Sequence, residues 1–294
     1  MNAIEALADA PIKTLATAAF VGLLMALLRR AGPRLAGLAA AVPVTSMPTL
    51  FWLSQQRGVN FAADAAVASL WATGLTALLA LTYARLCLRL RAPVAATLAL
   101  TGVAALALAT QGVTTALVVA LPLTVGVIAL AMRHSPRSPA QARHAGDWRR
   151  DAALAMTASG VMSLLAGELA RHSGPALCGV VAAIPIVAMS GVVVSHRQGG
   201  TPLAFQFLRG YLNGMLAKAT FLAGLAWMLG HGVGLAAWPL AASLALLVLT
   251  AQQGLRRVLA AQPRADGPNA VAPMCAASRA VVPTTDSLTC TCRA

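Results

Sequence analysis

The amino-acid sequence predicts an all-α, polytopic membrane protein with about nine transmembrane helices and an internal inverted repeat. Hydrophobic residues make up 59% of the 294 residues, charged residues only 10%, and the mean hydropathy is +0.75. Soluble domains contain about 45–50% apolar and about 25% charged residues. Apolar runs of about 18–27 residues recur along the chain, and each is long enough to cross a hydrocarbon core of roughly 30 Å.

The apolar runs define the predicted spans. They cover residues 13–30, 35–54, 61–84, 92–110, 112–132, 152–170, 175–195, 203–229 and 232–253. Runs 92–110 and 112–132 adjoin at Gln111 and Gly112, so they form either a tight hairpin of two spans or one span beside a re-entrant segment. Residues 258–294 are rich in Pro, Thr and Ser with scattered charges, which predicts a disordered tail.

An internal duplication sets the architecture. Residues 32–43 (GPRLAGLAAAVP) recur 142 positions later as residues 174–185 (GPALCGVVAAIP). Compared without a gap, residues 32–62 agree with their counterparts at 11 of 31 positions, including the pairs Met47/Met189 and Gly58/Gly200. Each copy has a proline inside an apolar run, and matched Pro- or Gly-interrupted helices in two halves of a membrane protein indicate a transport site.

The basic residues predict the orientation of the chain. With the N-terminus outside, the positive-inside rule is satisfied because the inner loops hold the basic clusters. These are Arg29, Arg30 and Arg34; Arg85, Arg89 and Arg91; Arg133, Arg137, Arg143, Arg149 and Arg150; His196 and Arg197; and Arg256 and Arg257. The chain is thus predicted to be a multi-pass inner-membrane protein with a cytoplasmic C-terminus. Its net charge of +14 reflects orientation, so the lipid bilayer is the expected partner and nucleic acid is not.

The spans divide as four, one and four. Residues 13–110 form the first transmembrane repeat, 111–132 a linker helix, 133–150 a basic cytoplasmic loop and 151–255 the second repeat. Because the linker adds one crossing, the two halves have opposite orientations in the membrane. The alternative has eight spans and parallel halves, and it would put one basic group on the outer side.

The two prolines mark the predicted binding site. Pro43 and Pro185 lie about halfway along their runs, where a proline removes one helical hydrogen bond and frees a carbonyl that must be covered at membrane depth. The hydroxyls of Thr45 and Ser46 follow Pro43. This pattern predicts unwound segments that contact a substrate. The other interpretation is a pair of kinked helices that only pack against each other, since Gly37 and Gly179 lie among alanines and favour close helix approach.

Lys218 is the second predicted feature, because charged residues inside spans are functional by default. It lies within residues 203–229, and its counterpart in the first copy is Thr76. A buried lysine can bind an anion or take part in proton coupling, whereas a lysine at this depth can also extend to the outer headgroups. On the same helix a polar stripe faces another direction and consists of Gln206, Arg209, Asn213 and Thr220. The predicted substrate-binding residues are Pro43, Thr45, Ser46, Pro185, Asn213 and Lys218.

Enzymatic signatures are missing from the sequence. It has no HExxH, no GxSxG and no Gly-rich phosphate loop after a strand. Its five histidines are scattered over several loops, and its five cysteines show no metal-ligand spacing. We therefore expect no enzyme, no metal and no cofactor.

The spacing of Ala36-Gly37-Leu38, four further residues and Pro43 resembles small four-helix bacterial membrane proteins of the GlpM type. The second copy departs from it, with Cys178-Gly179-Val180 before Pro185. The resemblance implies a four-span building block, here doubled, and implies no binding residue. The sequence as a whole predicts a transporter-like protein that moves a small solute or a lipid-derived molecule between two Pro-broken helices. The alternative is a non-transporting membrane scaffold or assembly protein.

Overall fold

The structure is a computed structural model of the whole chain. It describes residues 15, 19, 22, 23, 26, 27, 30–43, 46–110, 116–136, 149, 150, 152–154, 156, 157, 161, 174, 176, 177, 180 and 185–261. Several predicted features lie outside these residues, namely Thr45, Gly179, most of the basic loop, most of runs 13–30 and 152–170, and the tail after residue 261. The compact unit is Met1–Gly254, and a second unit begins at Leu255, of which only the end of one helix is described.

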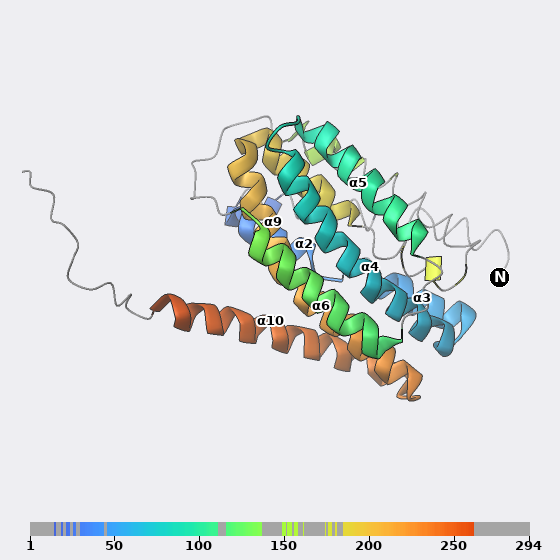
Figure 1. Cartoon of the computed structure of the whole chain (residues 1–294). Coiled ribbons are helices and arrows are strands. Elements are labelled where there is room, and N and C mark those ends of the chain that lie inside the picture. The colour runs from blue at the N-terminus through green and yellow to red at the C-terminus, as the bar shows by residue number, and fades with distance from the viewer. Residues whose placement is uncertain are drawn as a thin grey trace, which may run out of the picture. The chain divides into compact units, whose positions relative to one another are not determined.

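The described part of the chain is helical and contains no strand (Figure 1). Its helices are α2 (Pro33–Ala40), α3 (Ser46–Arg57), α4 (Val59–Leu86), α5 (Ala92–Ala109), α6 (Leu117–His134), α9 (Ile186–Gly230), the short 3₁₀ helix η1 (Gly234–Ala236) and α10 (Ala237–Ala261). Five stretches among the described residues are long and apolar enough to cross a membrane: Val59–Leu86, Ala92–Ala109, Leu117–His134, Ala188–Gly230 and Gly234–Leu255. Several apolar helices of this kind fit a multi-pass membrane protein.

Helices α4, α5 and α6 correspond to three consecutive predicted runs. The indole Nε1 of Trp71 in α4 donates to the Thr110 hydroxyl just after α5, 3.3 Å away, and Figure 1 shows that the two helices run in opposite directions. The Thr124 hydroxyl of α6 donates to the Leu70 carbonyl of α4 at 3.0 Å. Figure 1 shows that α6 runs in the same direction as α4. The adjoining runs around Gln111 therefore form two separate long helices.

The predicted run 35–54 is not one helix. Helix α2 ends at Ala40 and α3 begins at Ser46, with Ala41 to Pro43 in a turn and bend. The physical reason is Pro43, which has no N–H to donate and whose ring clashes with a preceding carbonyl in a continuous helix. Its own carbonyl accepts the amide of Met47 at 2.9 Å and so opens the next helix.

Helix α9 is broken in its interior. As a straight helix its 45 residues would be about 68 Å long, more than twice a hydrocarbon core of roughly 30 Å. Non-helical angles at Gly199 and Gly200 divide it into a first arm (residues 186–198) and a second arm (residues 201–230). The break lies between the predicted runs 175–195 and 203–229. Gly200 has φ 67° and ψ −165°, values that side chains disfavour.

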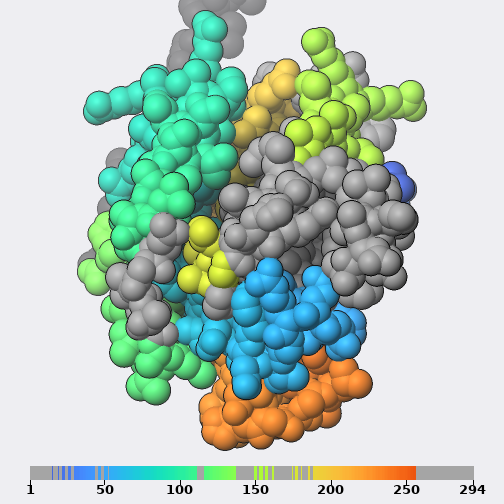
Figure 2. Space-filling view, turned by 90° about the vertical axis from the view of Figure 1, so that its right-hand side faces the viewer, coloured from blue at the N-terminus to red at the C-terminus, as the bar shows by residue number. Residues whose placement is uncertain are grey.

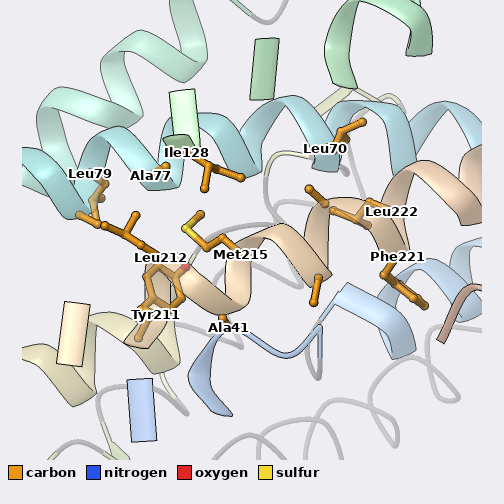
Figure 3. Packing of buried hydrophobic residues seen from close by; sticks show 14 of the residues in the cluster. Ala41, Leu70, Ala77, Leu79, Ile128, Tyr211, Leu212, Met215, Phe221 and Leu222 are labelled. Carbon is orange, nitrogen blue, oxygen red and sulfur yellow. The ribbon is translucent and has the colours of Figure 1, made fainter. Parts of the chain in front are cut away.

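The second arm of α9 and α4 form the buried centre of the compact unit. Figure 3 shows Leu70 and Leu79 of α4 facing Leu212, Met215 and Leu222 of α9, with the two helices running in opposite directions. Most side chains of α4 and α9 are buried, whereas most side chains of α5, α6 and α10 are at least partly exposed. That distribution is expected for a bundle whose outer helices contact lipid.

Contacts outside this centre join α3 to the beginning of α10. The rings of Phe51 and Trp238 pack edge to face, with centroids 5.3 Å apart. Figure 2 shows the atoms of α3 against the segment where α9 ends and α10 begins. Helix α10 then packs on the second arm, where a Cβ on Gly224 would lie 3.4 Å from Leu244.

Basic residues gather at one end of the compact unit. Arg85 lies in the last turn of α4 and Arg133 in the last turn of α6, and these helices run in the same direction. His196 belongs to the same end, because its ring nitrogen Nδ1 is 2.9 Å from the hydroxyl of Tyr83 in α4. Groups that the sequence assigns to separate inner loops therefore share one side.

Candidate functional site

The two prolines occupy equivalent positions in their local structures. Pro43 precedes α3, and Pro185 precedes α9. The Pro185 carbonyl accepts the amide of Met189 at 2.8 Å, just as the Pro43 carbonyl accepts that of Met47 at 2.9 Å. Each proline thus begins a new helical segment.

Helix α2 packs backbone to backbone against the second arm of α9. A Cβ on Gly37 would collide with the Phe207 carbonyl, and one on Gly210 would collide with the Arg34 carbonyl. A close helix approach at Gly37 is therefore present, but its partner is the second arm of α9 and not the predicted helix that contains Gly179. Small residues allow such contacts between helices in membranes.

The same contacts fix the relative direction of the two segments. Gly210 meets Arg34 near the start of α2, whereas a Cβ on Gly214 would lie 2.6 Å from Cβ of Ala41, just after its end. Position along α2 therefore increases together with position along the second arm, so the two run parallel. The break after Ala40 lies beside the part of the second arm that follows Gly214.

Lys218 comes next along this side of the second arm. Gly210, Gly214 and Lys218 are spaced by four residues, so each is turned by only about 40° from the one before. A helical side chain leans toward the N-terminal end of its helix, which directs Lys218 back toward Gly214 and the break after α2. Lys218 is only 6% exposed. Within the described part of the chain it makes no hydrogen bond and no ion pair.

Buried hydroxyl groups of α4 lie opposite this region. Ser69, Thr73 and Thr76 fall on one face of α4 and are buried. The Tyr211 hydroxyl interacts with the Thr76 side chain across the helix pair. In α9, Lys218 follows Tyr211 by seven residues, about two helical turns. In α4, Ser69 precedes Thr76 by the same number of residues. Because the helices are antiparallel, and because Figure 3 shows Leu70 opposite Leu222, Lys218 lies between the levels of Ser69 and Thr73.

We call these opposed faces the polar seam, and its members are Ser69, Thr73 and Thr76 of α4 with Tyr211 and Lys218 of α9. The Thr73 hydroxyl donates to the Ser69 carbonyl, and the Thr76 hydroxyl donates to the Thr73 carbonyl, each at 2.8 Å. These two hydroxyls are therefore satisfied by their own helix and keep lone pairs facing the seam. Lys218 is the only charged side chain of the seam.

The remaining predicted site residues are only partly brought together. Ser46 is fully buried at the start of α3, directly after the break. Asn213 is buried too, but it is five residues from Lys218 and turned by about 140°, so the two side chains leave the helix in different directions. It contacts other groups of the protein and is not free.

Pro185 lies at the depth of Asn213. A Cβ on Gly191 in the first arm would lie 2.6 Å from Cε2 of Phe207, so the first arm runs back along the second. Pro185 is six residues before Gly191, and Asn213 is six residues after Phe207. The two proline breaks therefore adjoin the second arm at similar depths, one near Asn213 and the other between Gly214 and Lys218.

Several of these residues were not predicted as site residues. They are Ser69, Thr73 and Tyr211. Ser69 and Thr73 carry a signal that could have identified them, because they recur with Thr76 at helical spacing inside an otherwise apolar run. The Tyr83–His196 hydrogen bond gives no such signal, since its residues are 113 positions apart.

Metal ligands are not grouped in the described part of the chain, where no three residues among His, Cys, Asp and Glu come together. Comparisons of the chain with protein-family models, with curated proteins and with solved structures found no match.

Proposed function

We propose that this chain is an inner-membrane transporter of inverted-repeat design, which moves a small solute past the breaks at Pro43 and Pro185. The observation that carries the proposal is the parallel run of α2 and the second arm of α9. Transporters of this design bind their substrates near the midplane at the interface between repeats, where helices are interrupted.

The direction of α2 favours inverted over parallel halves. Helix α2 belongs to the second predicted span of the first half, and the second arm belongs to the third span of the second half. In parallel halves, second and third spans cross the membrane in opposite directions, so these two segments would be antiparallel. In inverted halves they cross in the same direction, in agreement with the contacts of Gly210 and Gly214.

Matched breaks support the duplication behind this design. Pro43 and Pro185 accept equivalent amides, from Met47 and Met189. At the next boundary both copies have a glycine with positive φ, 90° at Gly58 and 67° at Gly200. All three pairs are separated by 142 positions.

The basic end of the compact unit sets the proposed orientation. Arg85, Arg133 and His196 share that end, and the positive-inside rule assigns it to the cytoplasm. The N-terminus is then outside and the C-terminus cytoplasmic. The proposed path leads from this end, along the second arm, to the breaks.

The alternative function is a non-transporting scaffold, and the close backbone contacts of α2 favour it. At Gly37 and Gly210 the two backbones touch with no room for a side chain. A protein in which the breaks only permit such packing has no need for a water-filled path. The two functions differ in whether polar reagents reach the break.

Cysteine accessibility tests the proposal. In a variant without native cysteines, Ser46→Cys places a thiol directly after the break, and Leu247→Cys is the control on an outward face of α10, 65% exposed. A membrane-impermeant methanethiosulfonate is added to right-side-out and to inside-out vesicles. We expect Ser46→Cys to react from both sides, because alternating access opens its surroundings to each, and Leu247→Cys to stay unreactive in lipid. A Ser46→Cys thiol that reacts from neither side, or from one side only, would favour the scaffold.

A further inference from the structure

Lys218 carries a charge that no described residue of the protein neutralises. It lies twelve residues before the end of the second arm, about 18 Å along the helix axis. A lysine that extends to the headgroups keeps its end exposed, whereas Lys218 is enclosed by protein. An isolated charge in such a place is costly and persists in functional sites.

Acidic partners are missing from the surroundings of Lys218 in the described part of the chain. Asp64 is the only carboxylate among the described residues, and it is exposed near the start of α4. In the antiparallel register of α4 with the second arm, Asp64 lies more than a turn from the level of Lys218. No described carboxylate therefore balances Lys218, which leaves a place for the negative charge of a ligand.

The backbone carbonyls at the end of α2 already accept hydrogen bonds from backbone amides. The carbonyls of Leu38 and Ala39 at the end of α2 accept the amides of Ala41 and Val42, at 3.2 and 3.1 Å. Lys218 makes no bond to them. From the position of Lys218 on the second arm, we expect its ammonium group between the hydroxyls of the polar seam and the break after α2.

We propose that Lys218 binds the anionic group of a small solute, between the polar seam and the break after α2. The proposal rests on the proposed transport function and names its substrate class, which is a small organic or inorganic anion. One ammonium group matches one negative charge. Hydroxyls that rotate away from the carbonyls of their own helix, as those of Thr73 and Thr76 can, donate further hydrogen bonds to a bound anion.

The close packing beside Lys218 limits the size of the ligand. At Gly214 a Cβ would already be 2.9 Å from the Leu38 carbonyl and 2.6 Å from Ala41, so no ligand fits on that side. The ligand must enter from the side of the break. A carboxylate or phosphate on a compact solute meets these requirements, and a lipid headgroup offers the same chemistry from a different source.

Thermal unfolding of the purified full-length protein in a neutral detergent tests the proposal. The probes are acetate, benzoate and inorganic phosphate, compared with the uncharged acetamide and benzamide. We expect at least one anion to raise the unfolding midpoint by about 2–4 °C at a concentration well above its dissociation constant, and the uncharged analogues to leave it unchanged. Nanodiscs with and without phosphatidylglycerol identify a headgroup as the source, if the midpoint rises only with that lipid.

The unaltered protein and three variants are compared to distinguish binding at Lys218 from general effects of salt. Lys218→Met removes the buried charge at similar length and is expected to fold, to be at least as stable without anions, and to lose the anion response. Lys218→Arg keeps the charge and is expected to retain a response. Lys13→Gln removes the only other lysine of the chain and should respond like the unaltered protein. An anion response that persists in Lys218→Met, or a complete lack of response to every anion and to phosphatidylglycerol, would overturn the proposal.

The anion-binding experiment and the cysteine-accessibility experiment can fail independently of each other. If Ser46→Cys reacts from both sides while no anion acts through Lys218, the substrate class is wrong and transport stands. If an anion acts through Lys218 while Ser46→Cys is unreactive, the anion site stands in a protein that does not transport.

Discussion

The hydroxyl of Tyr83 and the imidazole Nδ1 of His196 lie 2.9 Å apart, and their rings pack edge to face with centroids 6.1 Å apart. Tyr83 is in the last turn of α4, and His196 is near the end of the first arm of α9. The hydrogen bond therefore joins the two sequence halves at the basic end, a few residues before the break at Gly199 and Gly200.

We predict that the Tyr83–His196 pair contributes measurably to stability. Tyr83→Phe removes one hydrogen bond and leaves the imidazole nitrogen without its partner, which costs about 0.5–1.5 kcal/mol. The measurement is the free energy of unfolding in a double-mutant cycle with His196→Ala, where we expect a coupling energy of similar size. Strictly additive effects would show that the two side chains do not interact.

The close contact of α2 with the second arm predicts that Gly210 cannot be enlarged. Gly210→Ala drives a methyl group into the Arg34 carbonyl, and overpacking of this kind costs about 1–3 kcal/mol. The matched control is Gly126→Ala in α6, where a Cβ meets nothing within 4 Å and alanine favours the helix by up to about 1 kcal/mol. Unfolding of both variants in the same detergent gives the comparison. Equal stability of the two would contradict the backbone contact.

Gly58 and Gly200, the glycines with positive φ at matched boundaries of the two copies, predict a loss of stability from backbone strain. Gly58 has φ 90° and ψ 165°, and Gly200 has φ 67° and ψ −165°, a region open essentially to glycine alone. A Cβ on Gly58 meets nothing within 4 Å, so Gly58→Ala isolates the backbone strain, which we expect to cost about 1–3 kcal/mol. Gly200→Ala should cost a similar amount.

Gly230→Ala is the control for this pair, since it has open space and no positive φ. The thermal midpoints of the three variants are the measurement. If Gly58→Ala and Gly200→Ala unfold with the midpoint of Gly230→Ala, the left-handed boundaries are not present in the protein.

Cys87 is predicted to be unreactive at neutral pH. It follows α4, and burial raises the pKa of its thiol to about 11. Because the thiolate is the reactive form, only about one thiol in a thousand is ionised at pH 8, and the rate should rise about tenfold per pH unit up to the pKa. The measurement is maleimide labelling of a variant that retains Cys87 as its only cysteine.

The adjacent Leu88 provides the control for Cys87. Its side chain is 58% exposed, so Leu88→Cys in a background without native cysteines should label at least about a hundredfold faster at pH 8. Rapid labelling of Cys87 itself at pH 7 would contradict its burial.

Much of the fold follows from hydropathy. The runs 61–84, 92–110 and 203–229 coincide with α4, α5 and the second arm of α9 to within a few residues. This works because a span must satisfy its backbone internally, so length and apolar composition nearly determine a helix. The interruption of run 35–54 has a signal in Pro43, but its extent depends on how α2 packs against α9.

The candidate site was less predictable than the fold. Lys218 could be identified from sequence, because a charge in a span is rare. Its direction could not, because it depends on the contacts of Gly210 and Gly214, which join residues far apart in the chain. The separation of Asn213 from Lys218 follows from helical geometry alone, whereas the depth shared by Asn213 and Pro185 needs the first arm to fold back.

The most direct test of the account is the sidedness of two loops on either side of α6. Reporter proteins fused after residue 111 and after residue 140 bracket the proposed linker helix, whose single crossing inverts the second half in the proposed design. We predict that the reporter after residue 111 is outside and the reporter after residue 140 is in the cytoplasm. Both reporters on the same side would contradict the inverted repeat, and with it the proposed transport function.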